Sequence, residues 1–230
     1  MPSLLLPQSS SSSSPPSLSR LSAPGVVVIA GTDKECGKTA LAEACLRLLP
    51  GAAGVKVTRV HEGKCPTGDD CGACDSLRGP FEIFSDESHP DEIAKKGTDT
   101  ARLAAASGGP SYWVKTRREF APQAFAALLD TTAVRGFSRL VIESNTFWHL
   151  SDPGLGLLIA RWPVPNPKAG VSDLFPRADL LLEWGETPNL AGLAFPAARA
   201  RIAAPGFAEL REIISPRLED WKRSAVKLPG

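Results

Sequence analysis

The run of β-branched residues that ends at Ala30, followed at once by a glycine-bounded loop, constrains this chain more than any other feature. Residues 26–30 read Val-Val-Val-Ile-Ala, which is typical of a buried strand. The loop 31–37 begins and ends with glycine, and Lys38 and Thr39 then open a helical pattern. In this context, backbone N–H groups can cradle phosphate at the positive end of a helix. We therefore predict a phosphate-binding loop, in which Lys38 contacts the terminal phosphates and Thr39 holds Mg²⁺.

The glycine spacing departs by one residue from the usual phosphate-loop pattern. Counted back from Gly37, the first glycine slot is held by Thr32, and the glycine lies one residue earlier. A glycine-rich turn with a chance Lys-Thr pair is the alternative, and the flanking strand and helix favour the phosphate loop. The candidate nucleotide-binding residues of the loop are Gly31, Thr32, Asp33, Lys34, Glu35, Cys36, Gly37, Lys38 and Thr39.

Strand and helix patterns alternate along the rest of the chain. Strands are expected at residues 55–60, 81–84, 111–114, 139–143, 155–160 and 180–183, and helices at 39–49, 100–107, 121–134 and from about 207 onward. A chain of 230 residues, 43% of them hydrophobic, can bury one substantial core. These patterns predict one α/β domain over residues 25–230, with a mostly parallel sheet and helices on both faces, the three-layer fold of P-loop NTPases.

Residues 1–24 form a Ser- and Pro-rich segment with an unbroken serine run from Ser9 to Ser14. So few apolar side chains cannot offset the entropy lost on ordering, and we expect a disordered tail. An organelle transit peptide is the alternative, because the segment contains Arg20 and no acidic residue.

The charge balance gives no reason to expect nucleic acid or a membrane as partner. The chain has 26 basic and 25 acidic side chains, a net charge of +1, which creates no general field for polyanions. No apolar run approaches the roughly 20 residues that span a bilayer. We expect a cytoplasmic protein.

Two charged residues stand at the expected carboxyl ends of strands, where parallel sheets bind their ligands. Glu143 closes an apolar strand, so its carboxylate is well placed to hold Mg²⁺ or to orient a nucleophile. Lys56 lies in the strand 55–60, and a merely solvated lysine is an equal alternative there. We predict Lys38, Glu143 and Lys56 as the catalytic residues.

A cysteine-rich insertion at about residues 61–80 is the second feature that carries chemistry. Cys71 and Cys74 have the spacing of a metal knuckle, whose two thiolates can face one ion across a tight turn. Thiolates with one imidazole favour Zn²⁺, an iron–sulfur cluster is an alternative, and free or redox-active thiols are another. The candidate metal ligands are Cys65, Cys71, Cys74 and His61, with His89 as a substitute.

The loop resembles the phosphate loop of dethiobiotin synthetase. The matching residues, including the extra residue after the first glycine, are Gly31-Thr32-Asp33, Glu35 and Gly37-Lys38-Thr39. Lys34 and Cys36 depart from that pattern, and Val57 follows Lys56 where that enzyme has a Lys-Pro motif.

Other segments resemble the molybdopterin-guanine dinucleotide biosynthesis protein B family of small GTP-binding proteins. The similar segments are residues 55–59 with His61, residues 96–102, in which Thr98 intrudes, and residues 141–145, in which Ser144 replaces a glycine. Both families belong to the dimer-forming branch of P-loop nucleotide-binding proteins. The resemblance implies nucleotide and Mg²⁺ binding, slow or partner-dependent hydrolysis, and a homodimer.

Residues 162–168, Trp-Pro-Val-Pro-Asn-Pro-Lys, follow a late strand and form the candidate base-binding loop, with Asn166 and Lys168 as contacts. The chain has no Asn-Lys-x-Asp guanine motif, so ATP and GTP are both open. Three functions compete: a nucleotide-hydrolysing accessory protein in cofactor or metal-centre assembly with a partner protein, an ATP-dependent ligase, and a metal-binding regulatory module with a structural nucleotide site.

Overall fold

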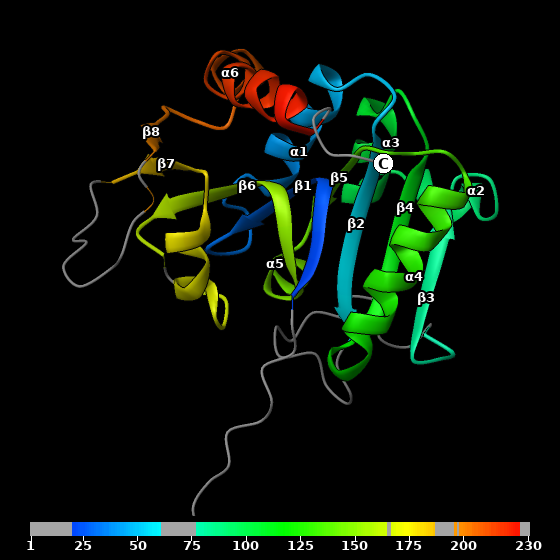
Figure 1. Ribbon diagram of the computed structural model, residues 1–230. Coiled ribbons are helices and arrows are strands. Elements are labelled where there is room, and N and C mark those ends of the chain that lie inside the picture. Colours follow the sequence, from blue (N-terminus) through cyan, green and yellow to red (C-terminus); the bar gives the residue numbers. More distant parts are fainter. Residues whose placement is uncertain (1–19, 61–76, 165–166, 187–195, 197, 226–230) are drawn as a thin grey trace, which may run out of the picture.

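The computed structural model describes residues 20–60, 77–164, 167–186, 196 and 198–225 (Figure 1). The secondary-structure elements within these ranges are, in chain order, β1 (Leu21–Gly31), α1 (Lys38–Leu48), β2 (Ala53–Val60), β3 (Phe81–Ser85), α2 (Pro90–Ile93), α3 (Asp99–Ala106), β4 (Ser111–Arg117), the 3₁₀ helix η1 (Arg118–Phe120), α4 (Ala121–Val134), β5 (Leu140–Glu143), α5 (Asn145–Leu150), β6 (Ser151–Trp162), the 3₁₀ helix η2 (Val171–Arg177), β7 (Leu180–Gly185), β8 (Arg199–Arg201) and α6 (Phe207–Ala225).

The strands of the described residues form a single eight-stranded sheet in the order β3-β4-β2-β5-β1-β6-β7-β8. The edge strand β3 runs antiparallel to β4, and every other neighbouring pair is parallel. The prediction of an α/β fold with a mostly parallel sheet is thus confirmed. Because β1 lies between β5 and β6, the loop after β1 is flanked by the carboxyl ends of both neighbours.

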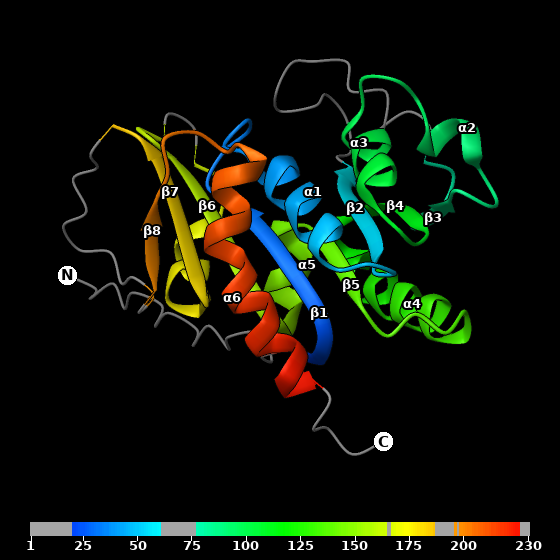
Figure 2. The ribbon, with the colours of Figure 1, turned by 90° about the horizontal axis from the view of Figure 1, so that it is seen from above.

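Helices lie on both faces of the sheet, because its central strands bury both sets of side chains. In β1, Val26, Val28 and Ala30 pack into a core with α4, α5 and η2. The alternate residues Val27 and Ile29 pack into a second core with α1, α3 and α6. The period of two in a strand sends successive side chains to opposite faces. Figures 1 and 2 show α1, α3 and α6 over one face and α4 and α5 over the other.

The strand β1 begins at Leu21, three residues before residue 24, the expected end of the N-terminal tail. Residues 21–23 pair with residues 151–153 of β6, and the register shifts between Ala23 and Val27. Burial of Ala23 and this pairing explain why residues 21–24 are ordered although they were expected to belong to the disordered Ser- and Pro-rich tail. The tail before residue 20 lies outside the described residues. None of the helices in the described part of the chain is long and apolar enough to cross a membrane.

Candidate functional site

The loop between β1 and α1 is held in place at its first residue and closed by an unusual backbone. The Thr32 N–H donates to the Ile159 carbonyl of β6 at 3.1 Å. Glu35 has φ 57° and Gly37 has φ 104°, both in the left-handed region. Glycine is required at residue 37, because a Cβ there would also lie 2.8 Å from Pro205 and 3.0 Å from Ile159. Glu35 accepts a conformation that costs a side-chain-bearing residue about 1–2 kcal/mol.

Gly31 leaves the space that the stem of Lys38 occupies. A Cβ on Gly31 would lie 2.3 Å from Cys36 Sγ and 2.6 Å from Lys38 Cγ. The Lys38 ammonium reaches across the loop and donates to the Asp33 carbonyl at 2.5 Å, with Cys36 Sγ at 3.6 Å. The buried Cys36 thiol itself donates to the Asp33 carbonyl at 3.3 Å. The glycine at residue 31, although offset by one residue, therefore allows the lysine to lie over the loop.

The side chain of Asn145 fixes the end of β1. Its Oδ1 accepts from the Gly31 N–H at 3.2 Å, and its Nδ2 donates to the Gly31 carbonyl at 2.9 Å. Asn145 follows β5 and begins α5, whose N-cap Ser144 accepts from the Phe147 N–H at 3.0 Å. The cap fixes the start of α5, and α5 in turn presents the Asn145 amide to β1.

A chain of hydrogen bonds joins α1, β5, β2 and α3 at the carboxyl edge of the sheet. The Thr39 hydroxyl donates to Glu143 Oε2 at 2.9 Å. Glu143 Oε1 accepts from Lys56 Nζ at 2.5 Å, and the same ammonium donates to Asp99 Oδ2 at 2.6 Å. Glu143 and Thr39 are buried, at 3% and 8% exposure. The sequence-predicted residues Thr39, Glu143 and Lys56 are thus brought together, with Asp99 as an additional member.

The pKa values of Lys56 and Asp99 keep this cluster ionised. Burial alone would lower the pKa of Lys56, but the carboxylates of Glu143 and Asp99 outweigh it and raise that pKa above its usual value. Burial would raise the pKa of Asp99, but the charge of the Lys56 ammonium and its hydrogen bond hold that pKa below its usual value. One ammonium between two carboxylates leaves a net negative charge beside Thr39.

The donor set of this cluster fits Mg²⁺. This ion binds through one or two carboxylates together with waters and substrate phosphate oxygens, and it prefers oxygen ligands. Thr39, Glu143 and Asp99 would supply such oxygens next to the loop. Within the described residues, no group of three or more His, Cys, Asp and Glu side chains is arranged to hold a metal by itself. The set is therefore suited to an ion shared with a phosphate ligand, whose positive charge would neutralise developing charge on phosphate.

Lys168 lies beside the loop, not in a separate region. Its backbone N–H donates to the Thr32 carbonyl at 2.9 Å. Burial, together with the positive charge of Lys38, lowers the pKa of Lys168 to about 8. Asn166, the other predicted base contact, lies outside the described residues.

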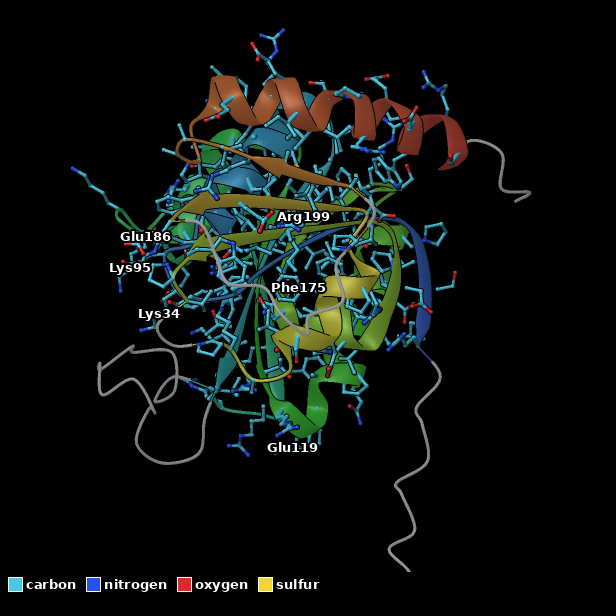
Figure 3. The ribbon with its side chains drawn as sticks, turned by 90° about the vertical axis from the view of Figure 1, so that its left-hand side faces the viewer. Lys34, Lys95, Glu119, Phe175, Glu186 and Arg199 are labelled. Atoms are coloured by element: carbon cyan, nitrogen blue, oxygen red, sulfur yellow. The ribbon has the colours of Figure 1, made fainter. Side chains whose placement is uncertain are left out.

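Two further residues of the loop are Lys34, which is exposed, and Cys36, whose carbonyl accepts a hydrogen bond from a side chain of β7. Lys34 is exposed, and its N–H donates to Asp33 Oδ1 at 2.6 Å. Figure 3 shows Lys34 and Glu186 at the edge toward which β6 and β7 run. On the side of β7, the Trp184 indole N–H donates to the Cys36 carbonyl at 2.8 Å. The Arg161 guanidinium lies 5.6 Å from the centroid of the Trp184 ring. Trp184 thereby joins the loop to the end of β7.

The predicted cysteine site cannot be placed, because Cys65, Cys71, Cys74 and His61 lie outside the described residues. His89, the substitute ligand, is described. It is exposed, and its Nδ1 lies 2.9 Å from Ser88 Oγ, while its ring packs edge-on against Phe84 at 4.7 Å between centroids. Its role as a substitute ligand stays a prediction.

Asp99 and Asn145 are the residues of the site that sequence reasoning did not select. Asp99 stands in the first turn of α3, after the N-cap Thr98, whose hydroxyl accepts from the Ala101 N–H. Arg102 of α3 forms a bidentate pair with Glu43 of α1, at 3.0 and 2.8 Å, which holds α3 against α1. The capped helix start with an aspartate was a usable signal, since an acid there is stabilised by the helix dipole.

Comparisons with known proteins do not identify the chain: no family model, curated protein or solved structure matches it. The site therefore stands on its own geometry.

Proposed function

We propose that this protein binds a nucleoside triphosphate together with Mg²⁺ and acts on its terminal phosphate. The observation that carries the proposal is the hydrogen-bonded chain Thr39–Glu143–Lys56 beside a glycine-bounded loop with Lys38 folded over it. Such a loop at the start of a helix offers backbone N–H groups and a positive dipole to phosphate. The neighbouring carboxylates offer oxygen ligands to the ion that accompanies the phosphate.

Each residue has a distinct role in this proposal. Lys38 would leave the Asp33 carbonyl and neutralise the terminal phosphates. Thr39, Glu143 and Asp99 would hold Mg²⁺, directly or through water. Lys56, fixed as a cation by two carboxylates, would stabilise negative charge at the reacting end of the ligand. Phosphoryl transfer depends mainly on such positioning and charge, and no covalent protein intermediate is needed.

The wider role that we propose is that of a slow NTPase, acting as a homodimeric accessory in cofactor (molybdopterin-like) or metal-centre assembly. Two features support it. The loop resembles those of the dimer-forming branch of P-loop proteins. In addition, the cysteine-rich segment begins directly after Val60, the last residue of β2, the strand that also carries Lys56. A metal held by those cysteines would lie in the chain close to the nucleotide residues.

The proposal is tested by binding measurements on the purified protein. Isothermal titration with ATP and GTP, with and without Mg²⁺, is expected to give Mg²⁺-dependent binding of at least one of them. Lys38→Ala is expected to abolish binding, and Thr39→Val to remove its Mg²⁺ dependence. Lys222→Met, which alters a lysine of α6 paired with Glu219 at 2.7 Å, is the control and should bind like wild type. Unchanged binding in Lys38→Ala would overturn the proposal.

An ATP-dependent ligase, resembling dethiobiotin synthetase, is the second candidate, and the position of Lys56 favours it. A fixed ammonium beside the Mg²⁺ ligands could bind a carboxylate or carbamate as the phosphoryl acceptor. ADP release that depends on a diamino acid, and that Lys56→Gln abolishes, is the result expected of a ligase. ADP release at the same slow rate with every acid tested would exclude it and leave water as the acceptor.

A metal-binding regulatory module is the third reading, and it rests on the cysteines of the sequence alone. Elemental analysis of the purified protein, beside Cys71→Ser and Cys74→Ser variants, separates it from the others. Bound zinc or iron that is lost in both variants, with nucleotide binding intact, would support a separate metal site. Protein free of metal, with no loss of stability in either variant, would remove it.

A further inference from the structure

The segment after β6 brings Lys168 to the loop between β1 and α1, in addition to Lys38. Both backbone groups of Thr32, the residue after Gly31 in that loop, are hydrogen-bonded to β6 and the segment that follows it. Its N–H donates to Ile159, and its carbonyl accepts from the Lys168 N–H. Because the anchor is the main chain of Lys168, its side chain is available for another role.

The surroundings of the Lys168 side chain are those of the site. It is partly buried, and it makes no hydrogen bond or ion pair with another residue of the described part of the chain. The charged and titratable groups that act on it are Lys38 and Cys36 of the loop and α1, Lys56 of β2, and Glu143 of β5. Lysine side chains rarely lie buried without a partner, since the desolvated charge is costly.

An anionic ligand would remove this cost. Lys38 already donates a hydrogen bond to the Asp33 carbonyl, and Lys56 is paired with two carboxylates. The hydroxyl of Thr32 is also buried and has no hydrogen-bond partner among the described residues. A polyphosphate in the loop would supply both a charge for Lys168 and oxygen atoms next to the loop backbone.

We propose that Lys168 is a second phosphate-binding lysine, which contacts the polyphosphate of the nucleotide from the segment after β6. This proposal rests on the nucleotide-binding function proposed above and adds a residue to it. The lowered pKa of Lys168 in the free protein, about 8, supports the proposal and predicts a measurable proton uptake on binding. A bound anion raises the pKa of a neighbouring ammonium, so binding above pH 8 must draw a proton from the solvent.

Isothermal titration tests the proposal with ATP, GTP and inorganic tripolyphosphate, each with Mg²⁺. Lys168→Met is expected to weaken binding about tenfold to hundredfold. Its melting temperature should be no lower than that of wild type, because the main-chain anchor is retained and the costly buried charge is removed. Lys168→Arg should bind within about threefold of wild type. Lys222→Met serves as the matched control, since it removes a lysine from α6 and should bind like wild type.

Proton uptake separates contact with phosphate from a structural role. Titrations at pH 8.5 in buffers of different ionisation enthalpy should show uptake by wild type and none by Lys168→Arg, whose side chain stays protonated. Neither should take up protons at pH 6.5. If Lys168→Met binds the ligands with the affinity of wild type, the role of Lys168 is overturned, while the proposed nucleotide-binding function stands. Wild-type protein that binds only tripolyphosphate overturns the assignment to a nucleotide, and wild-type protein that binds none of the three ligands overturns the proposed function as well.

Discussion

Asn145 and Gly31 are paired through both polar groups of each: the asparagine amide accepts from the glycine N–H and donates to the glycine carbonyl. These residues lie 114 positions apart in the chain. The side chain thus satisfies the last backbone groups of β1 at the point where the sheet ends and the loop begins, where no further strand residue could do so. The loop starts from a fixed position as a result.

Replacing Asn145 is expected to destabilise the protein and to weaken nucleotide binding together. Asn145→Ala removes two hydrogen bonds and leaves the Gly31 groups unpaired, which costs about 1–3 kcal/mol in free energy of unfolding. Asn145→Asp keeps the acceptor but sets a carboxylate against the Gly31 carbonyl, so it should cost more. Urea unfolding measures both. Ser215→Ala, which removes one exposed hydroxyl contact on α6, is the control. Wild-type stability in both Asn145 variants would contradict this account.

Gly31→Ala is expected to impair binding more than stability. The added methyl group would overlap Cys36 Sγ and the Lys38 stem, which are side chains and can move, so the protein should fold. With Lys38 displaced, the protein should lose most of its affinity for nucleoside triphosphate, which titration calorimetry measures. Gly206→Ala is the matched control, because nothing lies within 4 Å of a Cβ at that position. Equal binding by the two variants would argue against the role of the Lys38 stem.

The ion pair of Asp99 should give acid-dependent stability. The pKa of Asp99 is lower in the folded protein than its usual value of 3.8. Its contribution is therefore complete above the usual value and is lost as the pH falls through the lowered one. The difference in unfolding free energy between wild type and Asp99→Asn, measured in EDTA, should be constant between about pH 6 and 8 and shrink in stronger acid. A difference that stays constant in strong acid would refute the ion pair's role.

The positive φ of Glu35 predicts a stabilising substitution. Glu35→Gly relieves a left-handed conformation and should raise the free energy of unfolding by about 0.5–1 kcal/mol, after the entropy of the added glycine is subtracted. Lys34→Gly, one residue earlier and without a positive φ, should instead lower it by about 0.5–1 kcal/mol. Thermal unfolding monitored by circular dichroism compares them. A loss of stability in both variants would contradict the assigned strain.

Much of the fold could be predicted from the sequence, because long periodic segments leave few alternatives. The helix expected at residues 121–134 is α4 with the same ends, and the helix expected from about 207 begins there. Short elements carried no such pattern. The six residues of α5 span less than two turns, and β8 has three residues, so neither shows a period.

The candidate site was predictable where a residue follows from the strand order. Glu143 was selected because it ends its strand at the common edge of the parallel sheet. Lys56 was expected near a strand end but lies within β2, and it contacts Glu143 because the two residues are opposite each other in the register of β2 and β5. The capped start of α3 could mark Asp99 as an acid at a helix N-terminus, but not its contact with Lys56, which depends on the packing of α3 on α1, including the long-range Arg102–Glu43 ion pair. Lys168 was selected as a contact of the base-binding loop, but the sequence could not reveal that its main chain bonds to Thr32.

The hydrogen bond from the Trp184 indole to the Cys36 carbonyl has a practical consequence. Tryptophan emission depends on the polarity around the indole and on what its N–H touches, so a shift of the loop would alter the colour or intensity of the light from this ring. The chain has five tryptophans, and the difference between the spectra of wild type and Trp184→Phe isolates the emission of Trp184. The protein thus contains its own optical reporter on the loop, readable in a cuvette without any label.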